Sequence, residues 1–180
     1  VYKASKGPQV VVSRSNPELV KRLFELEIPE IGRGVVEIMG VSRDPGYRTK
    51  VAVISRQHGI DPIGACIGVR GARIQNIVNE LGGERIDLIR WDPVEEAYIA
   101  NSLSPAEVVS VRLDAETNTA FLAVPDKQLS LAIGKEGQNA RLAAHLTGRR
   151  IDIRPESALM AAGEDMYPPP DVNMDAIPIV

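Results

Sequence analysis

The chain has 180 residues, of which 44% are hydrophobic and 25% are charged, and these fractions exclude a wholly disordered or fibrous protein. It contains no uninterrupted apolar run of about 18 residues and no signal-like apolar segment, so we expect a cytoplasmic protein without a membrane span. One cysteine, Cys66, and two histidines, His58 and His145, exclude an internal disulfide and predict neither a metal site nor another cofactor.

The net charge of −3 conceals an uneven distribution of charged residues. Residues 155–180 hold five acids and no base, which leaves 21 basic against 19 acidic residues in the rest of the chain. Six of these bases and only two acids lie between residues 127 and 154, the segment most attractive to an anion. The prolines and acids of residues 155–180 show no periodicity and predict a flexible acidic tail.

The first elements in chain order are a strand, a helix and a pair of strands. Asn16-Pro17 is a cap-plus-proline start signal for a helix with one apolar stripe, which Pro29 is expected to stop. Asp44-Pro45-Gly46 forms a turn between the two later strands. The predicted strands cover residues 9–14, 35–39 and 50–54.

A second cap-plus-proline signal, Asp61-Pro62, starts a short helix at residues 63–67. This helix runs directly into Gly68-Val69-Arg70-Gly71, and a longer helix with one apolar face follows. Gly82-Gly83 ends the longer helix, and residues 85–89 form a closing strand. The order is helix, strand, strand, helix, Gly-x-x-Gly, helix, strand.

The same order recurs in the second half of the chain. Asp92 and Glu95 can form a capping box at a first helix, and Asp126 can cap a short helix at residues 127–133. That helix runs into Gly134-Lys135-Glu136-Gly137. The remaining expected elements are strands at residues 107–113, 119–124 and 150–153 and a helix at residues 138–147.

The two halves superpose at an offset of 66 residues, which pairs Gly68 with Gly134 and Gly82 with Gly148. Such self-similarity indicates an internal duplication rather than one large domain. We therefore predict an α+β fold of two tandem domains, at residues 15–91 and 92–154, each a three-stranded sheet packed against three helices.

Each Gly-x-x-Gly loop offers a place where a nucleic-acid backbone can approach the main chain, because glycine carries no side chain. The outward amides and the dipole of the following helix favour phosphate at the same point. One such loop is a weak signal, but two loops in one repeated context predict binding of single-stranded RNA. With only seven aromatic residues in the chain, and none in either loop, an aromatic stacking platform is not expected.

The candidate RNA-binding residues come from both loops and from the helices that follow them. Arg70 and Lys135 add positive charge, Glu136 is expected to face away from phosphate, and Ile67 and Leu131 can touch base faces. The predicted site consists of Gly68, Val69, Arg70, Gly71, Arg73, Ile74, Ile133, Gly134, Lys135, Glu136, Gly137, Gln138, Asn139 and Arg141.

No enzyme is predicted from the remaining chemistry-bearing residues. Lys135 lacks the upstream glycine and the following Ser or Thr of a P-loop. Cys66 lies among apolar residues and is expected to be a buried small side chain rather than a nucleophile. Trp91, at the junction of the repeats, is expected to pack between the domains.

Several long strings resemble the NusA family of bacterial transcription elongation and termination factors, in its region of two type II KH domains. The resemblance covers about residues 7–154. Its most specific strings are Asp61-Pro62-Ile63-Gly64-Ala65-Cys66-Ile67-Gly68, Leu129-Ser130-Leu131-Ala132-Ile133-Gly134-Lys135 and Gly137-Gln138-Asn139-Ala140-Arg141-Leu142-Ala143.

The resemblance implies a non-enzymatic factor whose KH pair binds nascent single-stranded RNA and affects pausing, termination and antitermination. It implies RNA polymerase as a partner, with other transcription factors possible and the main polymerase-docking domain outside this chain. It also assigns residues 1–14 to the last strand of a preceding OB-like barrel. Two alternatives stay open: a KH pair acting on ribosomal or messenger RNA outside transcription, and a protein-interaction scaffold whose loops bind no RNA.

Overall fold

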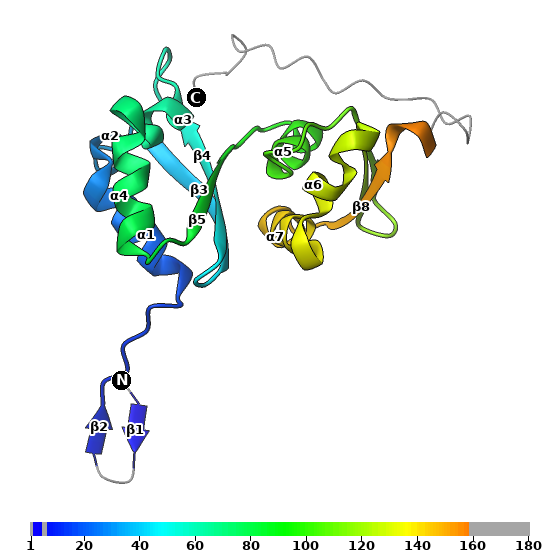
Figure 1. The fold of residues 1–180 in the computed structure, drawn as a ribbon. Helices are drawn as coiled ribbons and strands as arrows, with labels where there is room; N and C mark the ends of the chain where they lie inside the picture. The colour runs from blue at the N-terminus through cyan, green and yellow to red at the C-terminus, as the bar shows by residue number, and fades with distance from the viewer. Residues whose placement is uncertain (1, 5–6, 159–180) are drawn as a thin grey trace.

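The computed structural model describes residues 2–4 and 7–158 (Figure 1). The helices are α1 (Pro17–Glu27), α2 (Pro29–Gly32), α3 (Pro62–Ile67), α4 (Ala72–Glu80), α5 (Glu95–Ser102), α6 (Leu129–Ile133) and α7 (Gln138–Thr147). The strands are β1 (Tyr2–Ala4), β2 (Gly7–Gln9), β3 (Val36–Asp44), β4 (Arg48–Ser55), β5 (Arg85–Arg90), β6 (Ser110–Asp114), β7 (Thr119–Val124) and β8 (Arg150–Pro155). Short 3₁₀ turns cover Val69–Gly71, Asp126–Gln128 and Lys135–Gly137.

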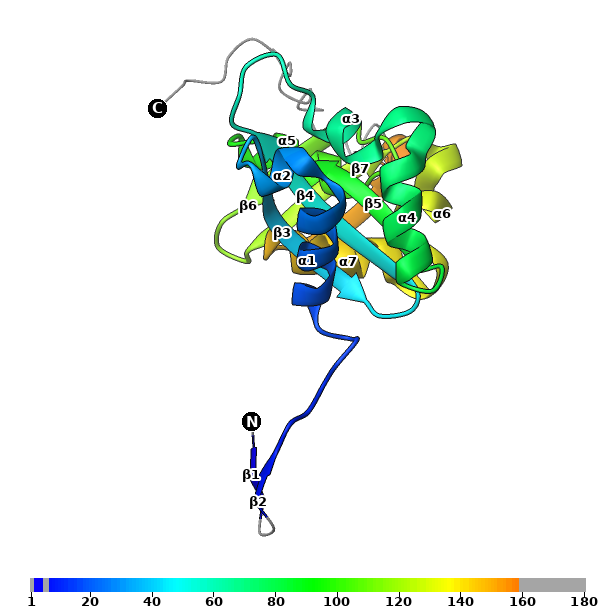
Figure 2. The ribbon, with the colours of Figure 1, turned by 90° about the vertical axis from the view of Figure 1, so that its left-hand side faces the viewer.

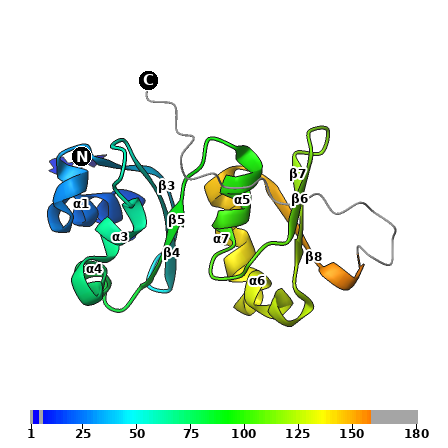
Figure 3. The same cartoon turned by 90° about the horizontal axis from the view of Figure 1, so that it is seen from above.

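One sheet topology occurs twice, which confirms the predicted α+β fold and its duplication. β3 and β4 are antiparallel and β4 and β5 are parallel, and β6, β7 and β8 repeat this order. Figure 3 shows that the layers alternate: α1, α3 and α4 cover one face of the first sheet, whereas α5 and α7 lie between the two sheets. The first sheet is therefore covered by helices on both faces.

The first domain starts as its sequence signals predict. Asn16 Oδ1 accepts a hydrogen bond from Glu18 N at 2.9 Å, and Pro17 occupies the first turn of α1. The apolar stripe of α1 buries Val20 and Phe24 completely. Pro29 does more than stop this helix, because it also begins the one-turn helix α2, which was not predicted.

Two predicted helix caps in the second half are wrong. Asp92 Oδ1 accepts from Val94 N at 2.8 Å, which closes a local turn before α5 instead of a capping box with Glu95. Asp126 Oδ1 accepts from Ser157 N at 3.1 Å, so its carboxylate ties the segment that follows β8 to the second domain instead of capping α6.

Both ends of the chain differ from the expected strand and tail. The predicted strand at residues 9–14 is wrong beyond Gln9: β1 and β2 pair with each other, and Val10, Val11 and Val12 are exposed and lie outside any strand. In Figures 1 and 2 this hairpin stands away from both sheets, and its assignment to a barrel stays a prediction. Residues 155–158 are folded, and the predicted tail from residue 159 onward lies outside the described residues.

The two domains meet through a buried cation. Lys50 on β4 is fully buried, and its Nζ donates to Ser104 O of the second domain at 2.7 Å and to Asp87 Oδ2 at 3.1 Å. Next to this seam the Trp91 and Tyr98 rings have their centroids 6.2 Å apart, consistent with packing at the junction. The seam thus includes a hydrogen-bonded charge and an aromatic contact.

The ionisation of Lys50 should make the free energy of unfolding change with pH in the alkaline range. Burial lowers the pKa of Lys50 from 10.5 to about 8, although the Asp87 carboxylate opposes this shift. Between these values the folded chain holds fewer protons than the unfolded chain, so stability rises with pH across this window. We expect urea titrations to show a gain of up to about 3 kcal/mol relative to a Lys50→Met variant, which cannot titrate there. Parallel pH profiles of the two proteins would contradict this assignment.

Candidate nucleic-acid interface

The two Gly-x-x-Gly loops share one backbone path. Gly68 and Gly71 have φ values of +74° and +78°, and Gly134 and Gly137 have values of +77° and +72°. The third residue of each loop, Arg70 or Glu136, is also left-handed, at φ +54° or +53°. The internal duplication therefore extends to the conformation of the predicted binding loops.

The first glycine of each loop is required by packing behind the loop. A Cβ atom on Gly68 would lie 2.6 Å from Arg73 Cγ, and one on Gly134 would lie 2.8 Å from Asn139 N. A Cβ atom on Gly71 or Gly137 would meet nothing within 4 Å. The second glycine of each loop therefore leaves an open backbone surface that a ligand can approach.

The helices that follow the loops begin without a side-chain cap from the described residues, whereas Asn16 and Asp61 cap α1 and α3. The positive ends of the dipoles of α4 and α7 therefore face the loops without a side-chain carboxylate to neutralise them, which favours an anion. The first amides of the two helices, Ala72 N and Gln138 N, donate to Val69 O and Lys135 O of the loops. Arg70 and Lys135 are exposed beside them and form no ion pair within residues 7–158. Both loops thus combine a helix start that no described side chain caps with an exposed cation.

Apolar side chains flank the loops. Val69 is 84% exposed, and Ile67, Leu131 and Ile133 are each more than one-third exposed, whereas Ile74 packs against the first core. Such side chains can cover base faces.

An open depression of about 620 Å³ lies beside the second loop. Its walls include Ile133 of α6, Ala140 of α7 and residues of β8, which pairs only with β7 among the described strands. Phe121 in its wall has the guanidinium groups of Arg112 and Arg154 at 4.9 Å and 5.4 Å from the ring centroid. An apolar wall beside a free strand edge and a loop can hold a splayed base.

Two predicted contact residues are engaged inside the protein. Arg73 Nη1 donates to Glu30 Oε2 and to Ala65 O, both at 2.8 Å. Asn139 is fully buried, and its Nδ2 donates to Leu103 O at 3.0 Å and to Ala132 O at 2.9 Å. The two residues occupy equivalent positions in the duplication, and their hydrogen bonds hold the short helix and the loop in place. The Asn139 side chain is closed off from a ligand, whereas the Arg73 side chain is 31% exposed and its contact with RNA stays a prediction.

Two other predicted residues contact the first domain. Gln138 Nε2 donates to Asp44 Oδ2 at 2.9 Å, and Arg141 Nη2 lies 3.7 Å from the same oxygen. Asp44, at the end of β3, was assigned only to a turn by sequence. It places the β3–β4 turn of the first domain directly against the helix that follows the second loop.

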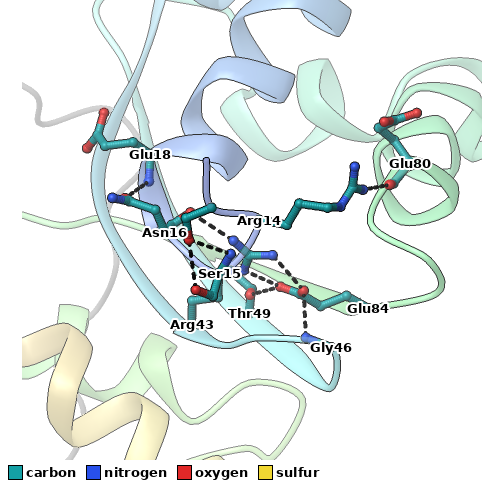
Figure 4. A network of polar contacts seen from close by, with 10 residues as sticks. Arg14, Ser15, Asn16, Glu18, Arg43, Gly46, Thr49, Glu80 and Glu84 are labelled. Carbon is teal, nitrogen blue, oxygen red and sulfur yellow. Dashed lines mark hydrogen bonds and ion pairs between the residues drawn. The ribbon is translucent and has the colours of Figure 1, made fainter. Parts of the chain in front are cut away.

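A buried carboxylate, also missed from sequence, fixes this turn (Figure 4). Glu84 is 1% exposed and accepts from Arg43 Nε at 2.8 Å, from Thr49 Oγ1 at 2.5 Å and from Gly46 N at 2.9 Å. Arg43 Nη1 also donates to Asn16 O at 2.8 Å. Burial opposes ionisation of Glu84, but these hydrogen bonds outweigh it and lower the pKa of its carboxyl.

The cysteine thiol and the possible metal-binding side chains give no sign of a reactive or metal-binding site in the described residues. Cys66 is fully buried, and burial raises the pKa of its thiol to about 12, so it is protonated at neutral pH. Within the described residues, His, Cys, Asp and Glu side chains form no group of three that could hold a metal ion. The helices described here include none long and apolar enough to cross a membrane.

Comparisons with family models point to one family, and a comparison with a solved structure supports the fold. Residues 14–91 match the model of the NusA-like first KH domain, and residues 95–160 match that of the NusA-like second KH domain. A crystal structure of APE1850, 22% identical, covers 74% of this chain and 96% of its own with a TM-score of 0.53, and it supports the fold alone.

Curated relatives named "Transcription termination/antitermination protein NusA" match most of the chain. Identity is 56% for the protein of Halalkalibacterium halodurans, 52% for that of Bacillus subtilis and 51% for that of Mycobacterium bovis, over 91%, 93% and 94% of this chain. The matched part is 43%, 45% and 47% of those relatives, so the chain spans less than half of their length. The chain belongs to the NusA family and carries its first and second KH domains.

Proposed function

We propose that the chain binds single-stranded RNA along its two Gly-x-x-Gly loops. The observation that carries this proposal is that the same site occurs twice. Each loop has a helix start without a side-chain cap, a second glycine with open space beside it, and an exposed basic residue, which is Arg70 in the first loop and Lys135 in the second. Each element favours a phosphate chain, and their occurrence at two equivalent points favours one continuous strand.

We also propose that this RNA binding serves transcription elongation, termination and antitermination in the cytoplasm. The names of the relatives support this role, as does the family assignment. RNA polymerase is the proposed protein partner, and the role needs binding rather than catalysis. We place the domains at residues 15–91 and 92–154 and assign residues 1–14 to a preceding barrel.

Charge reversal in the loops should weaken RNA binding without unfolding the protein. We expect the variant Val69→Asp, Arg70→Asp, Lys135→Asp, Glu136→Asp to bind an unstructured RNA of about twelve nucleotides at least tenfold more weakly, because each charge-assisted contact contributes roughly 1.5–3 kcal/mol. The dependence of log affinity on log salt should also become shallower. Fluorescence anisotropy across a salt series measures both quantities.

A matched control separates the loops from general charge repulsion. The first-loop pair Val69→Asp with Arg70→Asp removes one arginine and adds two aspartates, as does the pair Arg22→Asp with Leu26→Asp on α1, where these side chains are 71% and 83% exposed. The control pair should keep most of the RNA affinity. Equal losses in both pairs, or unchanged binding in the loop variant, would favour a protein-interaction scaffold.

A further inference from the structure

An exposed tyrosine stands beside the seam between the two domains. Tyr47, in the turn that joins β3 and β4, is 70% exposed. Three residues earlier in the same segment, Asp44 receives the hydrogen bond from Gln138, the residue that follows the second loop. A single exposed aromatic is common on protein surfaces, so its position and surroundings decide what it can do.

The turn lies between the two loops. Tyr47 O accepts from Arg85 N at 3.0 Å, and Arg85 comes just after the connection that ends α4. The first loop lies at the other end of α4, which has nine residues and is therefore about 14 Å long. A strand that leaves the first loop along α4 thus reaches Tyr47 before it meets the second loop.

The charges around Tyr47 suit a polyanion. Arg85 is exposed and has no ion-pair partner within residues 7–158, and Arg141 is 62% exposed. Glu84 is buried and paired with Arg43, so it adds little negative potential at the surface. Asp44 is the one acid of the turn, and Gln138 and Arg141 already face its carboxylate.

The turn is also held rigidly. Gly46, next to Tyr47, donates its N–H to the buried Glu84 carboxylate, and Gly46 itself has open space around it. An aromatic ring on a fixed turn loses little conformational entropy when it stacks on a base.

We propose that Tyr47, Arg85 and Arg141 form a bridging subsite for single-stranded RNA, in which Tyr47 stacks on a base between the two loops and the arginines contact neighbouring phosphates. This subsite rests on the proposed RNA binding and adds the segment of strand that neither loop holds. It is a single stacking position and not an extended aromatic platform.

The test compares RNAs of two lengths. An RNA of about twelve nucleotides can reach both loops, whereas one of about four is taken up whole by a single KH loop. Tyr47→Ala should weaken binding of the longer RNA about tenfold and leave binding of the shorter one unchanged, and Tyr47→Phe should bind both like the parent. A 2-aminopurine placed at successive positions should lose its fluorescence quenching at one central position in Tyr47→Ala alone.

The outcomes separate this inference from the proposed function. If the parent binds the longer RNA and Tyr47→Ala binds it equally well, the subsite is overturned while the loops stand. An equal loss on both RNAs also overturns it, because stacking beyond the first loop cannot contribute to an RNA that a single loop takes up whole. If the parent binds neither RNA, the proposed function fails first. Unchanged RNA binding with weaker binding of purified RNA polymerase assigns Tyr47 to a protein contact and overturns the proposal.

Discussion

Replacing Glu84 by Gln is expected to lower the free energy of unfolding by about 3–5 kcal/mol, because it leaves a buried arginine without its counter-charge. Arg43 is 4% exposed and Glu84 is 1% exposed, so water cannot take over the lost interaction. The same substitution weakens the acceptor that holds Gly46 and Thr49 in the turn. Urea unfolding followed by the fluorescence of Trp91 measures the loss.

Glu80→Gln is the matched control for this prediction. Glu80 is an exposed residue at the end of the neighbouring helix. Its backbone carbonyl accepts from Arg14 Nη2 at 2.8 Å, and its side chain has no hydrogen bond or ion pair with the described part of the chain. Its side-chain change should alter stability by less than about 0.5 kcal/mol. Similar stabilities for the two variants would mean that the Glu84 network carries no net stabilisation. Because the pKa of Glu84 is lowered, its contribution should also disappear in the parent as pH falls below the usual glutamate range.

The two glycines of the second loop should respond differently to the same substitution. Gly134 has φ +77° and ψ 170°, a region essentially restricted to glycine, and its new Cβ atom would lie 2.8 Å from Asn139 N. We expect Gly134→Ala to destabilise the protein by about 3 kcal/mol or more. Gly137 has φ +72° and ψ 14° with open space beside it, so Gly137→Ala should cost only about 1–2 kcal/mol.

RNA affinity should respond strongly to the substitution of Gly137, although its stability changes little. A methyl group on Gly137 points into the open space where the proposed phosphate chain approaches, so Gly137→Ala should bind RNA weakly while it stays folded. Thermal unfolding and RNA titration of both variants, with Gly71→Ala as the equivalent of Gly137→Ala in the first loop, provide the comparison. Equal stabilities for Gly134→Ala and Gly137→Ala would contradict the packing role of the first glycine.

The order of elements could be predicted because it depends on local signals. Asp61-Pro62 starts α3 as expected, with Asp61 accepting from Ile63 N and Gly64 N. The same dipeptide at Asp92-Pro93 forms a turn instead, and α5 begins at Glu95. Where a helix begins therefore depends also on how its apolar residues, such as Ile99 and Leu103, reach the core.

The candidate site could be predicted only in part. The spacing of the glycines predicts the two loops, because the backbone conformation of a loop depends on residues that are close together in the sequence. The partners of the charged groups do not follow from spacing: Arg73 pairs with Glu30, 43 residues away, and Gln138 pairs with Asp44, 94 residues away. The Arg73–Glu30 pair exists only once α2 and α4 are packed in the first domain, and the Gln138–Asp44 pair only once the two domains are packed together. Arg73 and Asn139 therefore look like contact residues in the sequence, whereas in the structure their side chains form hydrogen bonds within their own domains.

The contact of Lys50 with Ser104 has a consequence for avidity. If a flexible linker joined the two domains, the second loop could take up many positions relative to the first. The effective concentration of the second loop, as seen by an RNA strand bound to the first, would then fall as the linker became longer. The buried seam instead fixes the separation of the loops, so a strand on the first loop meets the second at one set spacing. If the chain binds RNA as proposed, it should prefer RNA segments that stay extended between the two loops. RNA segments that form internal structure over the same distance should bind more weakly.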